Sequence, residues 1–209
     1  MPATIPVPER LAGPRVLLRV YDVADAPLVR AAVEQSREHL VPWLPWAAKA
    51  HRTPEDSIDF CVRSRARWLL RAGINYGIFT RDGTAYLGGI GLQGIDWSVR
   101  RFEIGYWLRA GAEGHGYMTE AVRLLTQMVF QELGATRVEI RCEGRNARSR
   151  KVAERSGFVH EATLRRYGQA TDGSLKDLLV FGMIREDFDA ALPGWRESLG
   201  RPDGSPDRQ

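Results

Sequence analysis

The chain has 209 residues, of which 44% are hydrophobic, and its 30 Lys and Arg residues against 26 Asp and Glu residues give a net charge of +4. This size allows one compact domain with a full core, and the mildly basic balance does not indicate a nucleic-acid-binding protein. The sequence contains no apolar run of about 18 to 20 residues and no signal-peptide core at its start, so we expect a cytoplasmic protein with no membrane partner.

The two cysteines, Cys61 and Cys142, lie far apart in the sequence. They form neither a disulfide framework nor a metal-ligand spacing, and reduced thiols fit the cytosol. The histidines show no ligand spacing either, so we expect no metal site. Cys142 ends an apolar strand and is expected to be a small core residue, because a cysteine nucleophile would need a partner histidine.

Basic residues are concentrated in residues 136–166, which hold nine Lys and Arg residues against four Asp and Glu residues. Clustered cations draw anions into a cleft, so this stretch suits a phosphorylated ligand. The alternative is a solvated, arginine-rich surface.

Hydrophobic periodicity and turn residues predict three strands and two helices in the first half of the chain. The predicted strands are residues 16–20, 74–80 and 86–95, and the predicted helices are residues 25–40 and about 54–71. Asp82-Gly83 is a hairpin signal between the last two strands, and Thr53 with Pro54 begins the second helix. Two prolines keep residues 41–46 from forming a regular helix.

The second half begins with a strand, a glycine-rich turn, a helix and a strand, followed by a short helix and a hairpin. These elements are expected at residues 102–108, 119–133, 137–142, 147–156, 158–167 and 176–184. Gly157 stands where a left-handed residue ends helices. We expect one domain over residues 14–188, a flexible segment before it (1–13) and, because Pro, Gly, Asp and Arg dominate there, a disordered tail after it (189–209).

Two glycine clusters could each bind a phosphate. Residues 89–94 match G-x-G-x-x-G, but a strand rather than a helix follows, so the dinucleotide fingerprint is not met and the glycines indicate a bulged or closely packed strand. The second cluster, residues 111–117, lies between a strand and a helix, where backbone N–H groups and the helix N-terminus can hold an anion. An ordinary tight turn would have the same glycines.

The order of four motifs resembles the GNAT superfamily, and more narrowly its Rim-type branch of ribosomal-protein N-terminal acetyltransferases (RimJ and RimL). The motifs are Phe-Glu-Ile-Gly-Tyr-Trp-Leu at 102–108, Gly-His-Gly-Tyr-Met-Thr-Glu-Ala at 114–121, Asn146-x-x-Ser149 and Ser156-Gly157-Phe158. The resemblance covers residues 14–188 and implies an α/β (α+β) fold with a central mixed, mostly antiparallel twisted sheet flanked by helices. It also implies transfer of an acyl group from acyl-CoA to a primary amine, most directly a protein N-terminus.

The resemblance implies that the glycine loop holds the pyrophosphate of acetyl-CoA or another short acyl-CoA, while the pantetheine arm pairs like an extra strand with the backbone near 106–108. The implied cofactor residues are Tyr106, Trp107, Leu108, Glu113, Gly114, His115, Gly116, Tyr117, Asn146 and Ser149. The family usually has Gln or Arg where this chain has Gly111. Asn146 also suits a capping role for the helix that follows it, and His115 is expected to be exposed to solvent.

The resemblance implies direct attack of the amine on the thioester, with a backbone N–H near Leu108 as the oxyanion donor. Glu103 is the first candidate for the general base, acting through water, and an ion pair at the sheet margin is its alternative. Ser149 is the implied proton donor to the thiolate, unless it only caps its own helix.

Two further residues complete the catalytic candidates. Tyr167 is a reserve acid, and Asp177 could act as base, bind the substrate ammonium or make a structural hydrogen bond. The Rim-type branch can use a glutamate just after residue 166, but residues 167–170 contain no carboxylate.

Other readings stay open at this point. The chain could bind CoA without turnover, acylate a small-molecule amine, or bind RNA or a ribosome through residues 136–166, although that stretch lacks the interleaved aromatics of nucleic-acid binders. Nucleic acid is therefore not an expected partner, whereas an acyl-CoA, an amine acceptor such as a ribosomal protein, and a second copy of the chain are.

Overall fold

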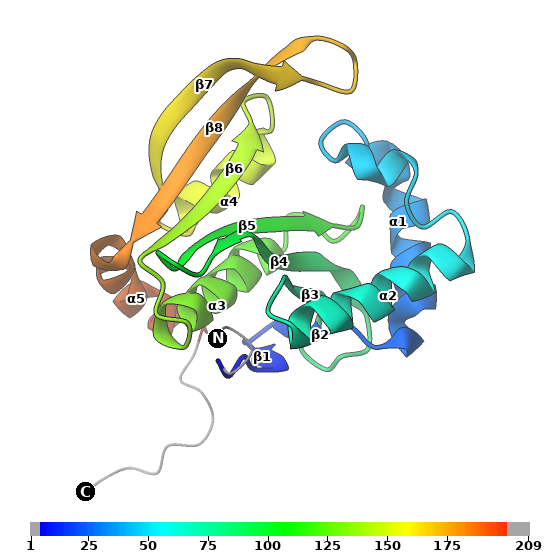
Figure 1. Ribbon diagram of the computed structural model, residues 1–209, viewed down its shortest axis with the longest axis horizontal. Coiled ribbons are helices and arrows are strands. Elements are labelled where there is room, and N and C mark those ends of the chain that lie inside the picture. Colours follow the sequence, from blue (N-terminus) through cyan, green and yellow to red (C-terminus); the bar gives the residue numbers. More distant parts are fainter. Residues whose placement is uncertain (1–4, 200–209) are drawn as a thin grey trace, which may run out of the picture.

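The computed structural model describes residues 5–199. An eight-stranded sheet in the order β1-β2-β3-β4-β5-β6-β8-β7 forms its centre (Figure 1). The strands are β1 (Arg10–Ala12), β2 (Val16–Val20), β3 (Ile74–Thr80), β4 (Tyr86–Asp96), β5 (Arg101–Leu108), β6 (Arg137–Glu143), β7 (Val159–Gln169) and β8 (Leu175–Ile184). Only the β5–β6 pair is parallel, so the predicted mixed, mostly antiparallel sheet is confirmed.

Five α-helices flank the sheet within residues 5–199. They are α1 (Ala26–Leu40), α2 (Pro54–Leu69), α3 (Tyr117–Gln131), α4 (Ala147–Arg155) and α5 (Arg185–Leu199). Helices α1 and α2 pack against each other and against β3 and β4, whereas α3 packs against β2, β4 and β5 and carries α4 and α5 (Figure 1). Alternate strand residues therefore enter two cores: Ile78 packs on the α3 side and its neighbour Phe79 on the α1 side.

Local signals explain most of these elements. The Thr53 hydroxyl accepts the Asp56 N–H while the Asp56 carboxylate accepts the Thr53 N–H, a capping box that starts α2 as predicted. Gly157, with a φ of +78°, follows the end of α4 in the left-handed region. The segment with two prolines forms only a short 3₁₀ turn, η3 (Pro45–Ala48).

Within the segment 1–13, which the sequence predicts to be flexible, the structure describes residues 5–13, and residues 10–12 form β1. Strand β1 pairs with β2, and the Glu9 carbonyl accepts the Val20 N–H at 3.0 Å. The Tyr76 hydroxyl also donates to the Pro8 carbonyl at 2.6 Å. These backbone partners fix a proline-rich stretch that has no periodic pattern of its own.

Residues 189–199 of the predicted disordered tail lie in α5, while residues 200–209 lie outside the described residues. The helix contains Pro193, which disfavours a helix in the sequence, but one face of the helix carries the buried aromatic residues Phe188 and Trp195. Phe188 stacks on Phe130 of α3 with ring centroids 4.6 Å apart, and Trp195 packs edge-on against Phe188. Burial of these two rings outweighs the poor local helix propensity.

The first glycine cluster lies inside β4, so a dinucleotide-binding turn is not formed there. A Cβ at Gly91 would stand 2.7 Å from the Ile74 carbonyl oxygen of the neighbouring strand β3. The glycines thus allow close approach of strands, as the sequence indicated. In the part of the chain that the structure describes, no helix has the length and apolar character needed to cross a membrane.

Candidate active site

Strands β5 and β6 separate soon after they meet. Strand β5 pairs with β4 from Arg101 to Leu108, but its parallel pairing with β6 covers only Arg101 to Glu103. Among residues 5–199, no strand pairs with residues 105–108 on the side facing away from β4. Backbone N–H and C=O groups of this stretch are therefore free to bind an extended ligand.

The glycine loop after β5 leads directly into α3. Gly111, Gly114 and Gly116 have φ values of +82°, +80° and +76°, and Gly116 is the N-cap of α3 without any side-chain cap. A Cβ at Gly111 or Gly114 would meet no atom within 4 Å, so the loop is open. The free N–H groups and partial positive charge of this helix N-terminus can hold a phosphate.

An ion pair between Glu120 and Arg15, which the sequence did not predict, supports this loop. The buried Glu120 carboxylate accepts the backbone N–H groups of Arg15 and Val16 at 2.8 and 3.0 Å. It also accepts the Arg15 Nε–H at 2.7 Å, while the Arg15 guanidinium donates to the His115 carbonyl at 2.8 Å. The only sequence signal was an acidic residue in the first turn of α3, because Arg15 lies far away in the chain.

Glu113 joins three elements beside the loop. Its carboxylate lies 2.8 Å from His39 Nε2 of α1 and 3.1 Å from the Arg148 guanidinium of α4. His115, the neighbouring loop histidine, is exposed, as expected, and its ring stacks on Tyr117 with centroids 5.5 Å apart. Glu113 thus connects the loop to helices on both sides, a function that the sequence did not indicate.

Tyr106, Asn146 and Ser149 come together across the gap between β5 and α4. The Tyr106 hydroxyl lies 3.0 Å from Ser149 Oγ and 3.2 Å from the Ser149 carbonyl oxygen. Asn146 caps α4, since its side chain accepts the Ser149 N–H at 3.1 Å. Burial raises the pKa of the Tyr106 phenol, so it stays protonated at neutral pH.

Glu103 lies on the opposite face of β5, next to the point where β5 and β6 are still paired. Its carboxylate accepts a hydrogen bond from Gln93 at 2.8 Å and lies 3.6 Å from the Arg141 guanidinium. Glu103 and Arg141 line a small opening of about 150 Å³, together with Gly94 and Glu139. The ion pair that the sequence analysis gave as the alternative is therefore present, and a water could still reach the half-buried carboxylate.

The hairpin β7–β8 carries the other two catalytic candidates. Strand β7 is irregular between Leu164 and Gly168, and Arg166 has a φ of +51°. The Asp177 carboxylate accepts the Arg166 N–H at 2.7 Å, which supports this bulge. The structural hydrogen bond that was one of three readings of Asp177 is thus formed.

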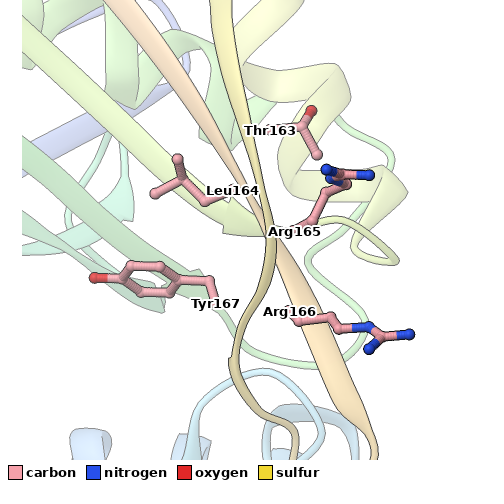
Figure 2. Close-up of a pocket in the computed structure, with 5 residues that line it drawn as sticks. All are labelled: Thr163, Leu164, Arg165, Arg166 and Tyr167. Carbon is pink, nitrogen blue, oxygen red and sulfur yellow. The ribbon is translucent and has the colours of Figure 1, made fainter.

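Near the bulge of β7 at Arg166, neighbouring side chains point to two different sides of the strand. Figure 2 shows Leu164 and Tyr167 on one side of the strand and Thr163, Arg165 and Arg166 on the other. These five residues border an open concavity of about 690 Å³. The Tyr167 side chain is 58% exposed, so a ligand on this face could reach it.

Segments from both halves of the chain approach each other around the same face. The Thr171 hydroxyl at the hairpin turn donates to the Pro42 carbonyl at 3.4 Å. The exposed Trp46 ring of η3 lies edge-on to Trp107 of β5, with centroids 5.9 Å apart. An acceptor on this side of β5 would therefore meet aromatic rings as well as the hairpin.

Five of the nine basic side chains at residues 136–166 form ion pairs. Arg137 contacts Glu139 and Glu161, and Arg145 contacts Glu143 and Asp172. This pairing favours the solvated-surface reading of the stretch over a continuous anion-binding patch. In residues 5–199, no group of three or more His, Cys, Asp and Glu side chains is placed to hold a metal ion.

Comparisons with known proteins agree with this geometry. A protein of Bacillus subtilis (strain 168) named "Putative ribosomal N-acetyltransferase YdaF" is 29% identical over 174 residues, which span 83% of this chain and 93% of that protein. RimL, described as a ribosomal L7/L12 alpha-N-protein acetyltransferase in complex with coenzyme A, superposes with a TM-score of 0.76 at 22% identity, covering 86% of this chain and 97% of RimL.

The acetyltransferase MccE, solved with acetyl-CoA and AMP, has a TM-score of 0.75 at 23% identity over 82% of this chain and 93% of its own. At such identities the two superpositions show the fold alone. The acetyltransferase (GNAT) domain family matches residues 15–159, more than half of the chain. Together with the glycine loop and the separated strands, this match shows that the chain belongs to the GNAT acetyltransferase family and is an N-acetyltransferase.

Proposed function

We propose that the protein transfers an acetyl or similar short acyl group from acyl-CoA to a primary amine, and that the acceptor is the α-amine at a protein N-terminus. The observation that carries the acyl-CoA part is the meeting of two features at one end of β5. The unpaired backbone of residues 105–108 leads to the open glycine loop at Gly111 and Gly114 and to the N-terminus of α3 at Gly116, which has no side-chain cap. An extended thioester with a pyrophosphate needs both features, side by side.

The loop would hold the pyrophosphate through the backbone of residues 113–117, with no lysine required. Tyr106, Trp107 and Leu108 would offer their backbone to the pantetheine arm, and Asn146 and Ser149 would border it from α4. This assignment is supported by the left-handed, open glycines and by the position of Asn146 and Ser149 beside Tyr106.

We infer direct attack of the amine, because neither cysteine suits an acyl-enzyme. Burial raises the pKa of Cys61 to about 12, and burial also raises the pKa of Cys142. A thiol that stays protonated is a poor nucleophile. The backbone N–H near Leu108 is the proposed oxyanion donor, and Ser149 is the proposed proton donor to the departing thiolate.

The base has two candidates on the acceptor side of the sheet. Glu103 is the first, acting through a water, since its carboxylate is only half-buried and is hydrogen-bonded to Gln93. Asp177 is exposed but already accepts the Arg166 N–H, which favours a structural function or an ammonium contact over proton abstraction. Tyr167 stays the reserve acid.

A protein acceptor is supported by the breadth of the face and by the relatives. Trp46, Leu164 and Tyr167 are exposed there, on segments that are far apart in the sequence. An N-terminal peptide could contact both segments, whereas a small amine would need only one. RimL is described as acting on a ribosomal protein, and an acceptor of that kind would place this enzyme in the cytoplasm.

The test is a panel of acceptors incubated with acetyl-CoA or succinyl-CoA and followed by intact mass and thiol release. One peptide has a free N-terminus and no lysine, and its matched partner has a blocked N-terminus and one lysine. A third arm contains a small diamine. We expect acylation of the first peptide only. Acylation of the diamine alone would move the acceptor to small molecules, and CoA binding without thiol release in any arm would leave a binding module.

A further inference from the structure

The side-chain hydroxyl of Tyr106 points at Ser149 rather than at the backbone groups of its own sheet. Tyr106 Oη lies 3.0 Å from Ser149 Oγ, although the two residues come from β5 and α4 and are 43 positions apart in the sequence. This contact stands at the place where β5 and β6 have already separated. The same hydroxyl lies 3.2 Å from the Ser149 carbonyl oxygen, which can only accept.

Both sides of the contact are rigidly held. Tyr106 projects to the same face of β5 as Phe102 and Ile104, which are fully buried against α3. On the other side, the Asn146 cap holds the Ser149 N–H and hence the first turn of α4. The distance between the two hydroxyls is therefore set by the fold rather than by mobile side chains.

We propose that Tyr106 is a positioning residue for the proton transfer to the leaving thiolate. The Ser149 carbonyl oxygen can only accept, so the Tyr106 O–H points toward Ser149, and in this proposal its hydrogen is shared with Ser149 Oγ. The serine then keeps its own hydrogen to donate to the thiolate. The inference rests on the proposed function of Ser149 as proton donor. It adds a side-chain function to a residue otherwise needed only for its backbone.

The proton balance of the step is closed without another reagent. The amine nitrogen bonds to the acyl carbon, the carbon–sulfur bond breaks, and the thiolate takes the Ser149 hydroxyl proton. The acylated nitrogen loses one proton through water to the proposed base, and bulk water carries an equivalent proton back to the serine oxygen. Tyr106 keeps its own proton throughout and stabilises the negative charge that develops on Ser149 Oγ during the transfer.

Burial keeps the Tyr106 hydroxyl protonated, as a hydrogen-bond donor must be. Because the raised pKa of Tyr106 keeps the hydroxyl protonated over the working pH range, it cannot become an acceptor for the serine by ionising. The groups that face it from the neighbouring elements are Ser149 of α4 and Cys142 of β6, whose pKa is also raised by burial. The phenol therefore keeps its hydrogen at all pH values used in an assay.

The experiment compares Tyr106→Phe, Ser149→Ala and the double variant with a control, Tyr76→Phe. Tyr76 is a buried tyrosine of β3 whose hydroxyl donates to the Pro8 carbonyl, away from α4, so it tests the loss of a tyrosine hydrogen bond as such. Each Phe variant loses a hydroxyl and no ring volume, so both are expected to fold. Thermal unfolding checks this.

We expect Tyr106→Phe to lower kcat at least tenfold while the KM for acetyl-CoA changes less than twofold, because the contact matters only when the thiolate leaves. The double variant should be no slower than Ser149→Ala, since Tyr106 acts through the serine. Tyr76→Phe should keep the wild-type kcat. If Tyr106 had only a structural function, Tyr106→Phe would lower the melting temperature and leave kcat unchanged.

The possible failures are distinguishable. If Ser149→Ala slows turnover and Tyr106→Phe does not, the inference is overturned and the proposed function of Ser149 stands. If the two effects multiply in the double variant, Tyr106 acts apart from Ser149 and the inference is again overturned. If Ser149→Ala keeps the wild-type kcat, the proton-donor assignment fails first, and the inference fails with it.

Discussion

Glu120 and Arg15 are joined through both the backbone and the side chain of the arginine: the carboxylate accepts the Arg15 N–H at 2.8 Å and the Arg15 Nε–H at 2.7 Å. Glu120 is buried, whereas the Arg15 side chain is half-exposed at the glycine loop. The start of β2 and the start of α3 are thereby held as one unit. Two predictions concern this unit.

The first prediction is that Glu120→Ala destabilises the fold by about 2 to 3 kcal/mol, because the buried N–H groups of Arg15 and Val16 lose their acceptor. Urea unfolding measures this free energy. The matched control is Glu132→Ala, at the exposed end of the same helix, which should change it by less than about 0.5 kcal/mol. Equal effects of the two variants would show that the carboxylate at 120 does not support the loop.

The second prediction separates backbone strain from ligand binding. Gly114 and Gly83 have φ values of +80° and +75°, and a Cβ would find space at both, but Gly83 lies in the β3–β4 turn. Alanine at either position should cost about 1 kcal/mol of stability. Only Gly114→Ala should weaken acetyl-CoA binding, by about tenfold or 1.4 kcal/mol. Calorimetry that finds unchanged affinity would remove the loop from the binding site.

The third prediction concerns Glu103. Glu103→Gln keeps an acceptor for Gln93 but removes the basic group, so we expect kcat to fall by about 10²- to 10⁴-fold with little change in acetyl-CoA affinity. The acidic limb of the pH–rate profile should vanish in this variant. If both the rate and the limb persist, the amine attacks in its neutral form without a protein base.

The fourth prediction concerns Asp177. Asp177→Asn can still accept the Arg166 N–H, so the hairpin should fold normally. If the carboxylate also holds the substrate ammonium, the KM for the acceptor should rise while kcat is retained, as happens when uniform binding is lost. An unchanged KM would leave Asp177 with only its hairpin contact.

The fifth prediction is a loss of stability in acid that arises from the ion pairs of the sheet. Arg137 lowers the pKa of Glu161; burial alone would raise the pKa of Glu139, but hydrogen bonds from Arg137 and Arg141 lower it overall. Carboxyl groups with a lowered folded pKa stabilise the fold above their unfolded pKa of about 4.3 and lose this contribution as the pH falls toward the folded value.

The free energy of unfolding should therefore decrease between pH 6 and pH 3. Glu161→Gln should flatten this dependence, and Glu38→Gln, an exposed change on α1, should not. A slope that is the same in both variants would assign the acid sensitivity to other groups.

Much of the fold could be predicted because the signals were local. Residues 16–20 and 74–80 are strands with the predicted bounds, and Thr53 caps α2 as expected. Helix α3 starts at Tyr117, two residues before the predicted start, because Gly116 itself is the N-cap. A glycine without a side-chain acceptor gives no capping signal, so the boundary was placed at the next favourable residue.

The contacts that could not be predicted join distant parts of the chain. Arg15 and Glu120 are 105 positions apart, and the sequence around each residue gives no sign that the two are in contact. Helix α5 could not be predicted because Pro193 and Gly194 are residues that disfavour a helix. The helix is stabilised by the packing of Phe188 on Phe130, a surface that exists only in the folded chain. Asp177 shows the same limit, since its partner is created by a bulge at Arg166.

The separated strands have a thermodynamic consequence for the enzyme. Residues 105–108 of β5 have one open side. If the proposed thioester completes the sheet there and binds only the folded chain, it also raises the stability of the fold. At a free concentration 100 times the Kd, this linkage contributes about 2.7 kcal/mol. Depletion of acyl-CoA would then expose the protein to unfolding and proteolysis, so the supply of one metabolite would govern the lifetime of its catalyst as well as its rate.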